Sequence, residues 1–233
     1  IENHRRTAAG QHVYLLGNRD WLIPAYERLA GFLESQLPAL AAIGDEAYRE
    51  GLVGAQTARS TIAFIEQLTT ESTVSTEHRD LGMSANMTFI TDRLYPDEKV
   101  VVWAHNFHIR HANHQIDPLP APFTMGHWQK QRLNDDVYTI GLYMYTGNTA
   151  ANDRSVYPVA QALSGSVESV LYNARRHWMF VDLRGAETSA GTGWIDGTVT
   201  ANAWGVNPVS MVPRTQYDGI LFVHTVTPPR YLP

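Results

Sequence analysis

Four histidines recur at every third position in residues 105–114, within the stretch VVWAHNFHIRHANH. Imidazole titrates near neutral pH and can accept or donate a proton, which suits His105 and His108 to acid–base chemistry. The amide of Asn106, between them, could hold a developing oxyanion or fix the tautomer of an imidazole. These three side chains are therefore the first candidates for a catalytic site.

The regular spacing does not make one site of all four histidines. On an α-helix, positions three apart drift by about 60° per step, so the first and last rings face opposite ways. We therefore expect His105 and His108 to be functional, and His111 and His114 to lie in a solvated loop. A metal-dependent hydrolase built on the His105/His108 pair is the alternative. Zinc needs three or four ligands, however, and H-x-x-H without the H-E-x-x-H pattern is a weak signal, so no metal is assigned.

A short apolar run, KVVVWA over residues 99–104, directly precedes the histidines and predicts a strand buried on both faces. Ligands of an open α/β sheet bind beyond the carboxyl ends of its strands. Such a strand would present His105 and Asn106 at the rim of the sheet. Three further apolar runs predict strands over residues 137–145, 177–183 and 219–226.

The other periodic segments are helical. Apolar residues at three-to-four-residue spacing predict long helices over 20–41, 52–70 and 77–94, and shorter ones near 124–133 and 166–175. Asp20 can cap the first helix and Pro24 fits its first turn. The Gly/Thr/Asn-rich stretch 185–210 indicates a loop that could include an edge strand.

This order of elements predicts an α/β fold, with a central mostly parallel sheet flanked by helices and a helical N-terminal portion. No linker or internal repeat divides the chain, so we expect residues 1–233 to form a single domain. Within it, residues 1–95 are expected to be mainly helical and residues 96–233 to form the α/β core.

A second group of ionisable residues, TEHRDLGMSAN over 76–86, lies at a predicted helix start. A helix that ends at Leu94 and joins the following strand must run antiparallel to it, which would bring Glu77, Arg79 and Asp80 close to His105. Arg79 could then support catalysis, and Glu77 and Asp80 could contact substrate. Helix capping and surface ion pairs are the alternative explanation.

Two aromatic residues could also contact substrate, namely Trp103, beside His105, and Tyr143, in the aromatic run YTIGLYMY. Other catalytic templates do not fit. The sequence has no G-x-S-x-G nucleophile elbow and no G-x-x-x-x-G-K-[ST] phosphate loop, and its GTG lacks the context of a dinucleotide site. No cofactor is expected.

Composition narrows the classes of protein further. The 233 residues carry a net charge of −5, and the 18 Lys and Arg are scattered, which argues against nucleic-acid binding. No stretch approaches the roughly 20 apolar residues of a membrane span. The absence of cysteine excludes disulfides and a cysteine nucleophile but leaves the compartment open, with the cytoplasm slightly favoured. The oligomeric state is not indicated.

The sequence VVWAHNFHI resembles the W-A-H-N-x-H-I signature of the erythromycin esterase-like family, which includes proteins labelled succinoglycan biosynthesis proteins. Four further segments look like family motifs in the same order, and together the five cover roughly residues 75–232. They are RDLGMSANMTFI at 79–90, TMGHWQKQRLNDDVYTIGLYMYTG at 124–147, FVDLR at 180–184 and YDGILFVHTVTPPRYL at 217–232.

The resemblance implies an ester hydrolase, built on an α/β core with helical additions, that opens carboxylic esters or macrolide lactones with a water nucleophile and without an obligatory metal. Carried over by position, His105 and His108 would be active-site histidines supported by Asn106 and Arg79. The substrate would be a small-molecule ester or lactone.

One family motif has no counterpart. The family's general-base histidine and its partner glutamate belong to a G-E-x-x-H-G-type motif, and nothing in residues 1–60 matches it. Either the chain is part of a longer fold whose N-terminal part carries the base, or this homologue is a non-catalytic ligand-binding protein. The first alternative makes the chain a partial erythromycin esterase-like domain.

Overall fold

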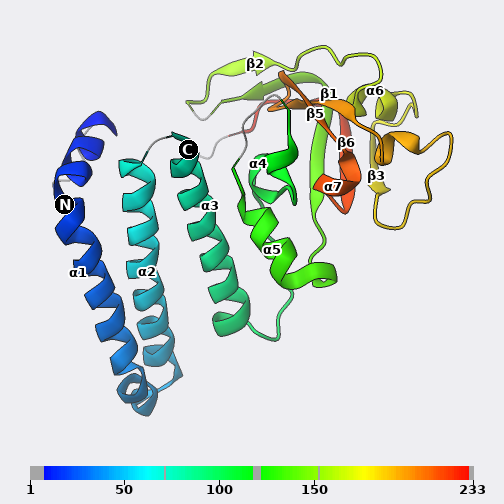
Figure 1. The fold of residues 1–233 in the computed structure, drawn as a ribbon. Coiled ribbons are helices and arrows are strands. Elements are labelled where there is room, and N and C mark those ends of the chain that lie inside the picture. The colour runs from blue at the N-terminus through cyan, green and yellow to red at the C-terminus, as the bar shows by residue number, and fades with distance from the viewer. Residues whose placement is uncertain (1–7, 71, 118–121, 152, 231–233) are drawn as a thin grey trace. The chain divides into compact units, whose positions relative to one another are not determined.

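The computed structural model describes residues 8–70, 72–117, 122–151 and 153–230 (Figure 1). The chain forms two compact units, residues 1–102 and residues 103–233. This division falls inside the run that sequence predicts as a strand, close to the expected change from helical to α/β structure. The expected single domain stays a prediction. No described helix has the length and apolar character to cross a membrane.

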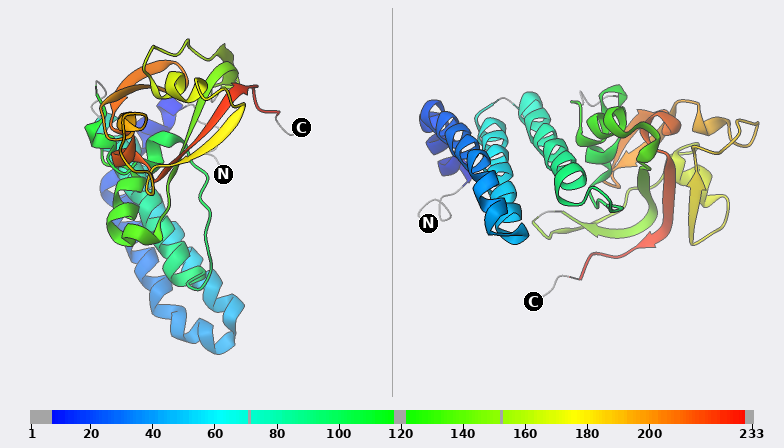
Figure 2. Two further views of the ribbon diagram at one scale, coloured as in Figure 1. Left: turned by 90° about the vertical axis from the view of Figure 1, so that its right-hand side faces the viewer. Right: turned by 90° about the horizontal axis from the view of Figure 1, so that it is seen from below.

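The first unit consists of three helices that lie side by side (Figures 1 and 2). They are α1 (Ala8–Ile43), α2 (Asp45–Thr69) and α3 (Ser72–Phe89), the last continued by the π-helical turn η2 (Ile90–Leu94). Small residues allow close packing: Ala55 and Ala58 are buried, and a side chain at Gly51 would collide with Leu40 of α1.

The long helices confirm the helical N-terminal portion, but two predicted helix starts are wrong. Described α1 already extends from Ala8, so Asp20 is not its cap, and Pro24 and Pro38 lie inside the helix. Packing against α2 stabilises the helix through both prolines, a tertiary effect that local sequence signals do not show. Helix α3 begins at Ser72, so residues 77–80 lie beyond its first turn.

The second unit contains a four-stranded sheet in the order β2-β1-β6-β3. Its strands are β1 (Ile140–Ala150), β2 (Val156–Pro158), β3 (Trp178–Asp182) and β6 (Gly219–Val226). Strands β1 and β6 run parallel with Leu142 opposite Leu221, whereas β2 and β3 pair antiparallel to their neighbours. The α/β class is confirmed, but the sheet is mixed instead of mostly parallel.

A hairpin of β4 (Val199–Ala203) and β5 (Asn207–Met211) occupies the stretch predicted as loop. Short helices complete the unit, namely α4 (Asn106–Ile109), α5 (Met125–Leu133), α6 (Val167–Tyr172) and α7 (Pro213–Gln216), with 3-10 turns at Asn113–Gln115, Asn134–Asp136 and Gly193–Ile195. The predicted helices near 124–133 and 166–175 correspond to α5 and α6.

The core of the second unit lies between the sheet, the hairpin and α6. Ile220 and Phe222 of β6 and Val167 of α6 are fully buried, and Val209 and Met211 of β5 pack in the same cluster. Buried residues alternate along β6 as period-two strand geometry requires, because successive side chains point to opposite faces.

The run 99–104 is the principal error of the sequence prediction. The structure assigns no strand there, and Val101 and Trp103 are 91% and 86% exposed. A strand needs a neighbour to pair its backbone N–H and C=O groups, and no described strand pairs with this run. The apolar β-branched sequence is therefore compatible with a strand but has no sheet edge to complete one.

Candidate active site

His105 caps the short helix α4. Its backbone is extended (φ −64°, ψ 147°), and its Nδ1 accepts a hydrogen bond from the backbone N–H of Phe107 at 3.2 Å. Because Nδ1 is an acceptor, the neutral ring carries its proton on Nε2. Nε2 makes no hydrogen bond to the residues that the structure describes. It is therefore available to donate to a ligand.

One helical turn links the two candidate histidines. The backbone N–H of His108 donates to the carbonyl oxygen of His105 at 2.9 Å, and the ring of His108 meets Phe107 edge to face at 5.2 Å between centroids. His105 lies outside the helix as its cap, and the electrostatic effect of His108 on the pKa of His105 shows that the two side chains are close.

Asn106 attaches α4 to the sheet. Its Nδ2 donates to the carbonyl oxygen of Leu142 at 2.8 Å, and its Oδ1 accepts from the N–H of Leu142 at 2.9 Å. The side-chain amide thus pairs with strand β1 as a neighbouring strand residue would. Both the Nδ2 and the Oδ1 of the amide are engaged in this contact. A catalytic role for Asn106 stays a prediction.

Trp204, which sequence reasoning missed, stacks on His105. The two ring centroids are 5.4 Å apart with planes 16° from parallel, and the indole also lies 6.1 Å from the ring of Phe107. Trp204 follows β4 at the tip of the hairpin, in the stretch interpreted as loop. The only sequence signal at Trp204 is that a large aromatic residue precedes Gly205 in a Gly/Asn-rich segment. This pattern indicates a turn but does not indicate that the indole contacts His105.

Electrostatics keep His105 neutral. Desolvation lowers the pKa of His105 to about 4, and the charges of His108 and Arg110 act in the same direction. The imidazole is therefore uncharged near neutral pH. With Nδ1 committed to the helix cap, it presents the Nε2–H as a donor.

Tyr143 lies in the core instead of on an open pocket wall. Its hydroxyl is 3.2 Å from that of Tyr217, which accepts a hydrogen bond from Nε of the buried Arg110 at 2.8 Å. Burial raises the pKa of Tyr143 well above its usual value, so the phenol stays protonated. A substrate contact by Tyr143 would require an opening in this core, whereas Trp103 is fully accessible at 86% exposure.

The other two histidines of residues 105–114, His111 and His114, lie in different environments. His114 is exposed, and its ring lies against that of Phe123 in a tilted arrangement, with the centroids 4.7 Å apart. His111 was expected in a solvated loop, which is wrong: its side chain is only 9% exposed, and its Nε2 is 2.8 Å from the hydroxyl oxygen of Thr139 and 3.6 Å from Oδ2 of Asp218. Burial outweighs Asp218 and lowers the pKa of His111 to about 4.

Within the described part of the chain, no three histidine, aspartate or glutamate side chains are grouped as a metal site requires. The candidate site therefore consists of two histidines, an amide clamp and a stacked indole, all from residues 105–108 and 204. Side chains of these types can donate hydrogen bonds, and an imidazole can also transfer protons.

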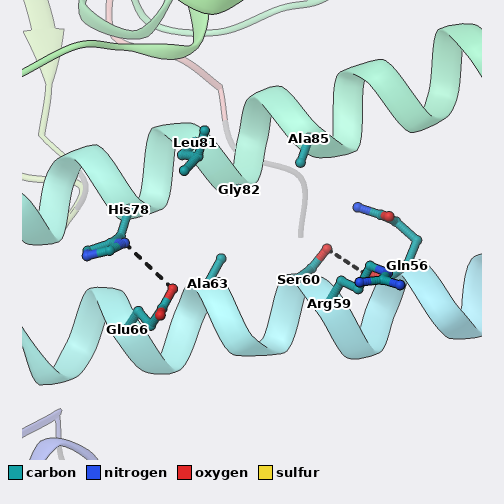
Figure 3. A pocket seen from close by; sticks show the side chains of 9 residues that line it. All are labelled: Gln56, Arg59, Ser60, Ala63, Glu66, His78, Leu81, Gly82 and Ala85. Carbon is teal, nitrogen blue, oxygen red and sulfur yellow. Dashed lines mark hydrogen bonds and ion pairs between the residues drawn. The ribbon is translucent and has the colours of Figure 1, made fainter. Parts of the chain in front are cut away.

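The helical unit holds the other predicted residues. On α3, Glu77 is half-buried, Arg79 is exposed and Asp80 is fully buried. The neighbouring His78 pairs with Glu66 of α2 at 3.6 Å (Figure 3). His78 is therefore explained by a contact between two helices. The approach of Glu77, Arg79 and Asp80 to His105 stays a prediction.

A cavity of about 170 Å³ lies between α2 and α3, and Figure 3 shows the side chains that line it. Its walls are half-exposed helix faces, with the pair of His78 and Glu66 at one end and Ser60 bonded to the carbonyl oxygen of Gln56 at the other. These polar groups satisfy one another, so the cavity is a gap in helix packing without an evident chemical role.

The described geometry thus combines an α/β fold with a histidine pair at a helix cap, and comparison with known proteins identifies the family. The erythromycin esterase family model matches residues 22–226, so the chain belongs to that family. The match starts in α1 and therefore includes the helical unit.

Individual relatives agree. The chain is 35% identical over 157 residues to the Bacillus subtilis (strain 168) protein named "Putative hydrolase YbfO", covering 64% of this chain and 35% of that protein. A solved Bacillus cereus protein superposes with a TM-score of 0.72 at 19% identity, covering 88% of this chain and 52% of its own.

Two further structures share the fold. A succinoglycan biosynthesis protein gives a TM-score of 0.70 at 18% identity, covering 88% of this chain and 49% of its own. A mutant of the erythromycin esterase EreC in its open conformation gives a TM-score of 0.58 at 16% identity. The match covers 87% of this chain and 52% of the EreC chain. The chain thus spans about a third of the curated relative and about half of each solved structure.

Proposed function

We propose that the protein hydrolyses carboxylic esters or macrolide lactones, with His105 as the residue that donates to the oxygen of the scissile group. The observation that carries the proposal is the cap of α4: Nδ1 of His105 accepts from Phe107, so the neutral ring presents Nε2–H outward. A donor fixed in this way can stabilise the oxyanion through a hydrogen bond.

The other predicted residues have supporting roles in this proposal. His108, one turn away, would exchange a proton with the same group, and Asn106 holds α4 on β1. Arg79 would add positive charge, and Trp103 would contact the apolar part of the substrate. Water attack also needs a base, which the resemblance assigns to a motif that residues 1–60 lack, so the activity is proposed for the full-length protein.

The test is hydrolysis of a macrolide lactone and of a nitrophenyl ester by the full-length protein. His105→Ala removes the donor and should lower kcat by about 100-fold or more. His114→Ala is the matched control. It removes an exposed histidine of the same segment, one that contacts Phe123, and should leave kcat unchanged.

Equal rates for the wild type and His105→Ala would refute the role of His105. Binding of a lactone, seen as a thermal shift, with no turnover by the wild type would refute hydrolysis and favour a ligand-binding homologue. A wild type that is active only before chelator treatment would instead favour the metal-dependent alternative.

A further inference from the structure

Trp204 has a backbone conformation that bulky residues rarely adopt. Its φ is +54°, and Gly205 after it has φ +75°. Successive positive φ values in a hairpin turn favour asparagine and glycine, because a Cβ is crowded in the left-handed region. A tryptophan at such a position costs conformational energy, which indicates that the indole is needed where this turn puts it.

The turn is held firmly enough to sustain this conformation. The N–H of Val206 donates to the carbonyl oxygen of Ala203 at 3.1 Å, and the N–H of Gly205 donates to that of Asn202 at 3.2 Å. The carbonyl oxygen of Trp204 itself accepts from the hydroxyl of Tyr157 at 3.2 Å. The hairpin tip is thus fixed by backbone bonds on one side and by strand β2 on the other.

The indole of Trp204 stacks on the imidazole of His105, the side chain to which the proposed function assigns hydrogen-bond donation. It lies nearly parallel to His105 at 5.4 Å and also against Phe107, the residue whose N–H binds Nδ1 of His105. The indole and the helix cap therefore constrain the same imidazole in two ways: the cap fixes which nitrogen carries the proton, and the indole fixes the plane of the ring.

We propose that Trp204 is a positioning residue for His105, held in a strained turn so that its indole fixes the imidazole plane and keeps water from one ring face. The proposal rests on the proposed function of His105 but concerns a residue that sequence reasoning did not select. The charged groups that act on this imidazole are His108 and Arg110, both from its own segment, whereas Trp204 comes from β4–β5. Removing the indole should restore water to the ring and raise the pKa of His105 from about 4 toward its ordinary value of 6.5.

The test follows the titration of His105 by NMR in the full-length protein with isotope-labelled histidines, between about pH 3 and pH 8. Trp204→Gly is the decisive variant, because glycine accepts the positive φ, so the turn loses its strain together with the indole. Trp204→Phe keeps an aromatic ring at the position, and Trp178→Phe changes a 75% exposed tryptophan of β3 as the matched control.

In Trp204→Gly the His105 titration should move upward by about one pH unit, and the acid limb of the kcat/KM profile should move with it. Trp204→Phe should restore most of the wild-type behaviour, and Trp178→Phe should titrate as wild type. An unchanged His105 titration in a folded Trp204→Gly protein would overturn the proposal. If the wild type hydrolyses no ester but the titration moves, the proposed function fails while the link between Trp204 and His105 stands.

Discussion

Two apolar runs of the chain look alike in sequence and differ in structure. KVVVWA over 99–104 and GILFVHTV over 219–226 both predict buried strands, yet only the second is one. Strand β6 lies between β1 and β3 and has Ile220 and Phe222 fully buried, whereas Val101 in the first run is 91% exposed. An apolar β-branched run becomes a strand only where neighbours complete its hydrogen bonds.

This difference changes how the histidines are positioned. We expected a strand before His105 to deliver it to the sheet rim. The structure instead fixes it from the residues that follow, through the cap on Phe107 and the clamp of Asn106 on Leu142. The predictions below test the contrast between the paired run and the exposed one.

The largest effect is expected in the core of β6. Phe222→Ala removes a fully buried ring and should lower the free energy of unfolding by about 3–5 kcal/mol. Val101→Ala in the exposed run should change it by less than about 0.5 kcal/mol. Urea denaturation of the 233-residue chain compares them, and equal losses would show that both runs are buried.

A smaller, pH-dependent effect is expected at the start of β6. Asp218 accepts from the N–H of Thr139 at 2.8 Å, and His111 is buried neutral beside it. Because the pKa of His111 is about 4 in the fold and 6.5 when unfolded, its stabilisation is complete above about pH 6.5 and is lost as pH falls toward 4.

Lowering the pH through that window should therefore cost on the order of 3 kcal/mol, and His111→Gln should flatten this part of the profile. Denaturation at several pH values measures both. The same slope in wild type and variant would mean that His111 is not the buried neutral group.

The contact of Asn106 with β1 should contribute less to the free energy of unfolding. Asn106→Ala leaves the N–H and C=O of Leu142 without their side-chain partner and should cost about 1–2 kcal/mol. Asn148→Ala, at an exposed position of the same strand, is the control and should cost little. The two variants would be indistinguishable in thermal denaturation if the clamp did not form.

The smallest effect is expected at Trp103. Since its side chain is 86% exposed, Trp103→Ser should change the free energy of unfolding by less than about 0.5 kcal/mol. A loss of several kcal/mol in the isolated chain would place this tryptophan in a core and remove the contrast between the two runs.

Sequence reasoning recovered the features that local patterns determine. Periodicity and apolar runs located α2, α5 and β6. The choice of His105 and His108 as site residues stays a prediction. Strand β6 was found because its residues are mostly apolar and the strand is paired on both sides, so pattern and packing agree.

The rest depends on contacts between distant segments. Trp204 reaches His105 across 99 positions of sequence, and no local signal in a Gly/Asn-rich stretch identifies such a partner. His111 looked like its exposed neighbour His114, and only the approach of Asp218 and Thr139 buries it. The pairing of Asn106 with Leu142 is likewise a tertiary contact that residue type alone does not reveal.

The central claim is that the histidines are held from their C-terminal side, by α4 and its clamp, and not by the run that precedes them. Hydrogen–deuterium exchange on the 233-residue chain tests this most directly. We expect the amides of β6 (219–226) to exchange most slowly, those of His108 and Leu142 to be protected, and those of residues 100–104 to exchange fastest. Protection of residues 100–104 equal to that of β6 would contradict the account.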